Sequence, residues 1–126
     1  MTSKLFKDYL KTLFPDFKYF LGIENKEAEK SITIYNRSGT AGIFFYGEQH
    51  TQILPLTLIV NNNGNYADTE QTAYDLYNSL VYKNEVEFSG FVFSIFPKEN
   101  RLPAYIGRTD AGYYQFAIDI DLIYTK

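Results

Sequence analysis

The last third of the chain decides the fold. It contains F-V-F-S-I-F from Phe91 to Phe96 and Y-Y-Q-F-A-I-D-I-D-L-I-Y from Tyr113 to Tyr124. Apolar and polar residues alternate in both segments, which is typical of strands with one buried face. Between them lies P-K-E-N-R-L-P-A-Y-I-G-R-T-D-A-G, from Pro97 to Gly112, which we interpret as a long polar loop. A hairpin needs only about two to five linking residues, so the sequence predicts that this loop carries a binding function.

The final strand predicts a mixed outer face on the sheet. Its inward set would be Tyr114, Phe116, Ile118, Ile120 and Leu122, which leaves outward Tyr113, Gln115, Ala117, Asp119, Asp121 and Ile123. Such a face is too apolar to be left in water and too polar to form a second core. We therefore interpret it as a subunit interface.

The rest of the chain supplies two helices and three further strands. Apolar residues recur at helical spacing from Leu5 to Phe14, and an amphipathic helix is predicted from about Asp68, as its cap, to Tyr82. Residues 17–23 and 32–35 are expected to pair as an antiparallel hairpin. Residues 53–60 form a strong strand pattern, in which Pro55 predicts an edge position or a bulge. The prediction is a single domain over residues 1–126 with an α+β, two-layer fold. Its mostly antiparallel or mixed sheet would have about five strands, with two helices on one face.

Composition narrows the class of protein. The chain has 126 residues, no cysteine and a net charge of −3, which excludes disulfides and thiolate metal sites and disfavours nucleic-acid binding. No apolar run approaches the ~20 residues of a membrane span, and we expect no signal peptide. Twelve tyrosines and eleven phenylalanines are more aromatic residues than a core of this size needs. Tyrosine is enriched at protein interfaces, although it also suits strands in general.

The sequence predicts no catalytic or metal site and no cofactor. His50 is the only histidine, and no nucleophile motif frames any serine. The pairs Asp119/Asp121 and Glu85/Glu87 each lie on one strand face, where they could bind a divalent ion. We interpret them as charged strand surfaces that discourage aggregation.

Four segments of the second half together resemble a known family. They are a strand (Leu54 to Val60), a helix (Thr69 to Leu80), a strand ending at a proline (Phe91 to Pro97), and P-x-Y-I-G-R-T-D-x-G-Y-Y from Pro103 to Tyr114. This pattern resembles the small minor capsid and tail-terminator (tail completion) proteins of long-tailed phages and prophages. The likeness covers residues 50–126 by pattern and the rest by architecture. The aromatic, glycine-rich segment from Thr40 to Gly47 departs from it.

The resemblance implies a structural virion protein. Such proteins form a hexameric homo-oligomeric ring that ends the tail tube and joins tail to head, so the implied partners are further copies, the tail tube protein and the head-tail connector protein. The implied location is the virion, and the host cytoplasm during assembly. Alternatives are a head-closure or adaptor ring protein, a small non-catalytic protein-binding module and, last, an enzyme.

The candidate interface residues come from the long loop and from the aromatic segment. They are Arg101, Tyr105, Ile106, Arg108, Asp110, Tyr113, Phe44, Phe45 and Tyr46. A tyrosine flanked by arginines has the composition of an interface hot spot. On this interpretation, replacing Tyr105 and Arg108 leaves thermal stability nearly unchanged and weakens association.

Overall fold

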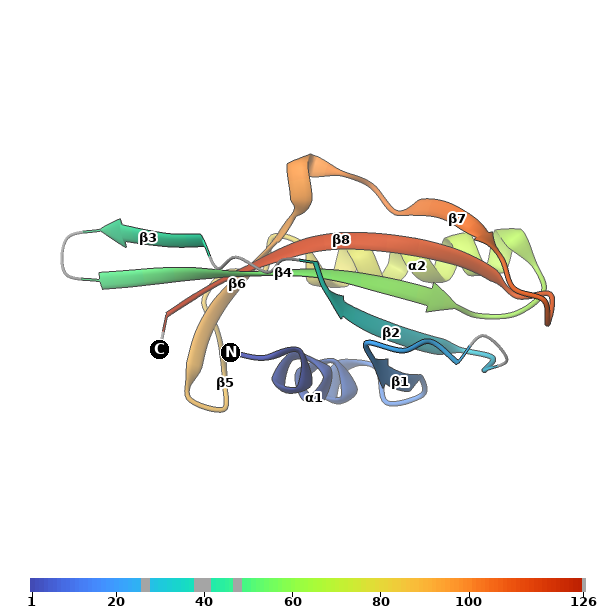
Figure 1. Cartoon of the computed structure of the whole chain (residues 1–126), viewed down its shortest axis with the longest axis horizontal. Helices are drawn as coiled ribbons and strands as arrows, with labels where there is room; N and C mark the ends of the chain where they lie inside the picture. The colour runs from blue at the N-terminus through green and yellow to red at the C-terminus, as the bar shows by residue number, and fades with distance from the viewer. Residues whose placement is uncertain (26–27, 38–41, 47–48, 126) are drawn as a thin grey trace.

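The computed structural model describes residues 1–25, 28–37, 42–46 and 49–125, and for residues 42–46 and 49–51 it describes the backbone alone. Two α-helices, eight strands and one short 3-10 helix follow one another in this part of the chain (Figure 1). They are α1 (Ser3–Leu13), β1 (Lys18–Leu21), β2 (Ser31–Asn36), β3 (Gly42–Tyr46), β4 (Gln49–Asn61), α2 (Tyr66–Leu80), β5 (Val86–Phe88), β6 (Phe91–Pro97), η1 (Lys98–Asn100), β7 (Ala104–Arg108) and β8 (Tyr114–Thr125).

All eight strands belong to one sheet. Its order is β1-β2-β4-β8-β6-β5, with β3 paired to β4 and β7 paired to β8. The α+β class and the mixed sheet are confirmed. The expected number of five strands is wrong, because β3, β5 and β7 were not predicted, and the two-layer arrangement is not confirmed, since the sheet curls around its core.

The long antiparallel pair β4–β8 forms the centre of the sheet, and an interrupted strand runs along each side of it. β8 pairs with β4 along one edge from Gln115 to Tyr124, so β6 and β7 must share its other edge. By the same argument β2 and β3 share the far edge of β4. Figure 1 shows β3 and the beginning of β4 extending well beyond the body of the sheet.

Prolines mark both interruptions. The carbonyl of Pro55 accepts a hydrogen bond from the Arg37 amide, so the polar backbone groups of this residue face β2 and β3. Proline has no N–H to continue the ladder there, and the pairing breaks between β2 and β3. Pro97 and Pro103 bracket the other break, between β6 and β7. The predicted edge position or bulge at Pro55 is wrong, because β4 is a central strand and its pairing with β8 continues through Pro55 without a register shift.

The predicted antiparallel hairpin of the first two strands is wrong, because β1 and β2 are parallel and Lys18 lies opposite Ser31. The hydroxyl of Tyr19 donates to the carbonyls of Leu10 and Phe14, at 3.3 and 2.7 Å, and so holds β1 against the end of α1. Burial raises the pKa of Tyr19 to about 12. Because β1 and β2 run in the same direction, the connection between them must carry the chain back to the start of β2. This connection begins at Gly22, whose φ of +73° suits glycine.

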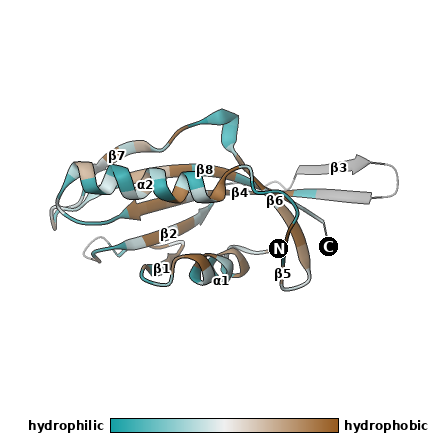
Figure 2. Ribbon diagram, turned by 180° about the vertical axis from the view of Figure 1, so that it is seen from behind, coloured by the Kyte–Doolittle hydropathy of each residue, from teal (hydrophilic) through white to brown (hydrophobic). Residues whose placement is uncertain are grey.

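One face of the sheet and both helices enclose a single core. The predicted inward residues of β8, from Phe116 to Leu122, are buried there, and they lie opposite alternate residues of β4. Helix α1 contributes Phe6, Tyr9 and Leu10. Helix α2 contributes mainly its predicted stripe, Ala73, Leu76, Tyr77 and Leu80. Figure 2 shows α2 lying over the central strands β4 and β8, roughly along their direction, and α1 beside β2.

The second helix begins earlier than predicted. Its cap is Asn65, whose side-chain oxygen accepts from the Asp68 amide, so Asp68 is a first-turn residue and not the cap. An acid in the first turn is stabilised by the positive end of the helix dipole. In the described part of the chain, neither helix has the length and hydropathy needed to cross a membrane.

Candidate interaction surfaces

The outer face of the central sheet is half-buried and mixed in character, as the sequence predicted. On β8, Ala117, Asp119, Asp121 and Ile123 all lie on this side with intermediate exposure. Their partners on β4 include Ile53, Pro55 and Thr57. Among the described residues, no helix covers this face.

Each aspartate of this face is paired with an arginine from one of the two sheet interruptions. Arg37, which follows β2, donates from Nη2 to Asp121 at 2.6 Å and to the carbonyl of Ile120 at 2.7 Å. Arg101, which follows η1, donates to Asp119 at 3.3 Å, and Thr57 donates to the same carboxylate at 2.6 Å. Because an arginine already pairs with each carboxylate, both are poor ligands for a divalent ion.

Arg37 is the more enclosed of the two arginines. Its side chain is 17% exposed, whereas that of Arg101 is 51% exposed. The Nε and Nη1 atoms of Arg37 are buried without a hydrogen-bond partner among the described residues. The ion pair with Asp121 therefore anchors the start of the β2–β3 interruption to β8.

Replacing Arg37 with methionine is expected to lower the free energy of unfolding by about 2 kcal/mol, since Asp121 would keep its charge on a half-buried face without a cation. The double variant Arg37→Met, Asp121→Leu should lose less than the single variant, because both charges are removed. Urea denaturation measures both. Arg101→Met is the control, with an expected loss of about 0–1 kcal/mol. Equal losses for the Arg37 and Arg101 variants would contradict this assignment.

The predicted loop from Pro97 to Gly112 is not a loop. Its centre forms β7, which pairs with β8 so that Tyr105 lies opposite Phe116 and Arg108 opposite Tyr114. The turn that joins β7 to β8 is short: the Thr109 amide donates to the Tyr113 carbonyl, and the Thr109 hydroxyl accepts from the Tyr113 amide. The prediction of a loop was therefore wrong for most of this segment. Its prolines and charged residues are typical of loops, although five of its residues form a strand.

An aromatic cluster lies between β7, β8 and the start of α2. The ring of Tyr66 is 5.4 Å from that of Tyr105, 5.6 Å from Tyr114 and 5.3 Å from Phe116, measured between centroids. The guanidinium carbon of Arg108 lies 5.3 Å from the centroid of the Tyr114 ring, within the range of a cation–π contact. Tyr66, Tyr105 and Arg108 are all exposed, so this cluster presents aromatic rings and a cation to solvent.

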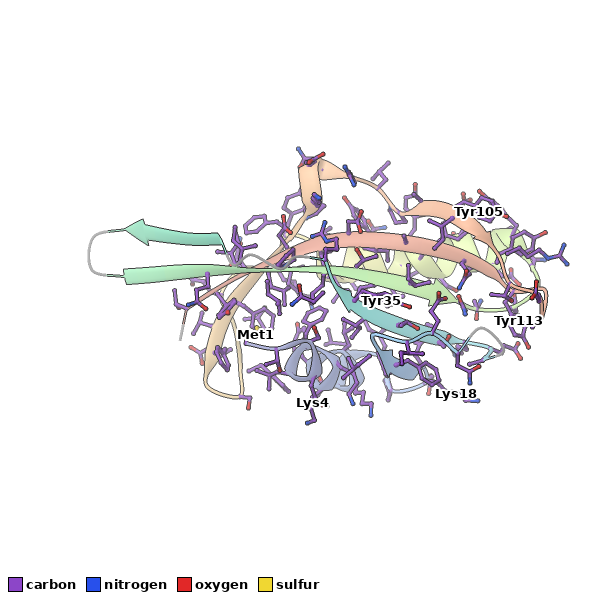
Figure 3. All side chains as sticks on the ribbon, viewed as in Figure 1. Met1, Lys4, Lys18, Tyr35, Tyr105 and Tyr113 are labelled. Atoms are coloured by element: carbon purple, nitrogen blue, oxygen red, sulfur yellow. The ribbon has the colours of Figure 1, made fainter. Side chains whose placement is uncertain are left out.

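The structure brings some of the predicted interface residues together and separates others. Tyr105, Ile106 and Arg108 are exposed on β7, whose outer edge carries no strand among the described residues (Figure 3). Asp110 and Tyr113 lie in the adjoining turn, whereas Arg101 is engaged with Asp119 and Glu99. Phe44, Phe45 and Tyr46 lie on β3, at the opposite end of the molecule, and their side chains lie outside the described part.

Sequence reasoning missed Tyr66 and Arg37. Tyr66 belongs to α2, and its contact with Tyr105 depends on long-range register. The partner of Arg37, Asp121, lies 84 residues away in the sequence. The only available signal was the proline at position 55, which marks the break beside it.

The described residues contain no group of three His, Cys, Asp or Glu side chains able to hold a metal ion. The side chain of His50 lies outside the described residues. The described surfaces thus consist of exposed aromatic rings, a mixed sheet face and open strand edges, which are features of a protein that binds other proteins.

Comparison with known proteins agrees with this class. A family model described as bacteriophage tail terminator protein matches residues 6–126. The chain belongs to the bacteriophage tail terminator family, and is accordingly a structural component of a phage virion. No curated protein matches it.

Proposed function

We propose that this chain forms a homo-oligomeric ring, with six subunits, that ends the phage tail tube and joins the tail to the head. Family membership over residues 6–126 is the observation that carries the proposal. The ring would contact the tail tube protein on one side and the head-tail connector protein on the other. Assembly would take place in the host cytoplasm before the ring enters the virion.

The surfaces described above support a ring of contacting subunits. Exposed Tyr105 and Ile106 lie on β7, and β3 with the first part of β4 extends away from the body at the other end (Figure 1). A ring needs two different surfaces per subunit, because each copy meets one neighbour head to tail on either side. The half-buried outer face supplies apolar area for contacts with the tube or the connector.

Mass measurement over a wide range of concentrations, with and without the tail tube protein, tests this proposal. The expected result is a discrete oligomer, either free or on the ends of tubes. A strict monomer that also fails to bind tubes would overturn it.

A further inference from the structure

The solvent-facing side of α2 is acidic. The helix carries Asp68, Glu70 and Asp75 and no lysine or arginine, so its three acids give a formal charge of −3. Asp68 accepts from the amide of Asn63, and Asp75 accepts from the amide of Gln71. Both donors are neutral, and no ion pair among the described residues reaches any of the three acids. The negative charge of α2 is therefore uncompensated within the subunit.

Helix α1 carries the opposite charge. Its residues include Lys4, Lys7 and Lys11 against Asp8 alone, for a formal charge of 3 − 1 = +2. Lys4 forms an ion pair with Asp8 at 3.3 Å, and Figure 3 shows Lys4 on the side of α1 that points away from the sheet. Lys7 and Lys11, one turn apart, have no ion-pair partner among the described residues.

Exposed apolar residues adjoin each charged helix. Near the C-terminal end of α1, Leu13 is 36% exposed, and Leu21 and Ile23 follow at 39% and 79%. At the N-terminal end of α2, Tyr66 is 42% exposed beside Tyr105 at 47%. Partial burial raises the pKa of Tyr66, and the neighbouring carboxylate of Glu70 raises it further. The acidic and aromatic parts of this surface therefore adjoin each other.

We propose that α1 of one subunit docks antiparallel against α2 of the next subunit, with Lys11 and Lys7 facing Glu70 and Asp75. This inference rests on the proposed ring and specifies its subunit contact. The antiparallel direction follows from the positions of the exposed apolar residues. They lie near the C-terminal end of α1 (Leu13) and at the N-terminal end of α2 (Tyr66), so these two ends must meet. At 3.6 residues per turn, Lys7 and Lys11 lie about 40° apart on one stripe of α1, and Glu70 and Asp75 lie about 140° apart on the two flanks of the solvent-facing side of α2, so the two lysines can lie between the two acids.

The charges of α1 and α2 favour a second copy of this chain as the binding partner. The two surfaces complement each other in charge, and they lie on different elements of the same chain, so docking is head to tail. Head-to-tail contacts generate a ring when the rotation closes. A contact of α1 with α1, or of α2 with α2, would instead bring like charges together.

Two charge-reversed variants test the contact. The first carries Lys7→Glu and Lys11→Glu, and the second carries Glu70→Lys and Asp75→Lys. Each alone should associate roughly tenfold more weakly than the wild type, since attractive pairs become repulsive. An equimolar mixture should regain wild-type association, because each acidic α1 then meets a basic α2, and the reverse, around a ring with an even number of subunits.

Sedimentation at low and high salt, with and without tail tube protein, measures these effects, and salt should weaken the wild-type contact. Glu85→Lys with Glu87→Lys, on the β5 side, is the matched control for the second variant and should associate normally. If the wild type assembles while both reversed variants assemble equally well, or if the mixture is not restored, this contact is wrong although the ring stands. A wild type that never assembles would overturn the ring itself.

Discussion

Replacing Phe6 with alanine is expected to lower the free energy of unfolding by about 4 kcal/mol, the range for a fully buried aromatic side chain. Phe6 is completely buried, and its ring lies 6.4 Å from that of Phe93 in an edge-on arrangement. The same ring is 6.0 Å from Tyr9, so its loss opens a cavity between α1 and β6. Guanidinium denaturation with a linear extrapolation measures the change.

Leu13→Ala is the matched control, because Leu13 lies on the same helix but is exposed. Its expected loss is under about 1 kcal/mol. Similar losses in the two variants would mean that α1 is not held to the sheet through Phe6. Because α1 also carries Lys7 and Lys11, weakening its attachment should impair subunit contact as well.

Replacing Tyr105 and Arg108 together with alanine is expected to weaken association with neighbouring subunits or the tube by about 2 kcal/mol, if both are interface anchors. It should also lower the free energy of unfolding by about 1–2 kcal/mol. The second effect differs from the expectation drawn from sequence. Tyr105 lies in a paired strand, and its ring is 5.8 Å from Phe116 and 6.1 Å from Tyr114.

Tyr82→Ala is the control for this double variant. Tyr82 is also an exposed tyrosine, but it donates to Asn100 and lies outside the candidate surfaces. Its loss should leave association unchanged. Sedimentation reports association and thermal unfolding reports stability, so the two effects can be separated. Normal association in the double variant would show that β7 only completes the sheet.

The alternation of apolar residues was sufficient to predict the central sheet. On β8 the inward set from Phe116 to Leu122 follows directly from a period of two, and the same holds for Leu54 to Val60 on β4. Both strands lie at the centre, where one face is buried and register is strongly specified. The two helices were predicted for the same reason, since their apolar stripes recur at helical spacing.

Strands that depend on a distant partner could not be predicted. β7 is short, exposed and preceded by Pro103, and only its pairing with β8 makes it a strand. The direction of β1 depends on hydrogen bonds from Tyr19 to the end of α1. Local patterns carry no information about either arrangement, because a strand's partner is set by tertiary packing.

The candidate surfaces were predicted in part. Composition alone pointed to Tyr105, Ile106 and Arg108, and the structure exposes all three on one strand. It also assigns Arg101 to an ion pair with Asp119, eighteen residues away in sequence, which no spacing rule predicts. The charge difference between α1 and α2 was present in the sequence. It acquired meaning only when the structure showed which of these side chains face solvent.

The length of tail tubes assembled from the phage's tail tube protein tests the central claim most directly. Electron microscopy would compare tubes grown with and without this chain. The proposed function predicts that tubes grown with it stop elongating and carry a ring of the chain at one end. Tubes that keep the same lengths and bear no bound chain at either end would contradict it.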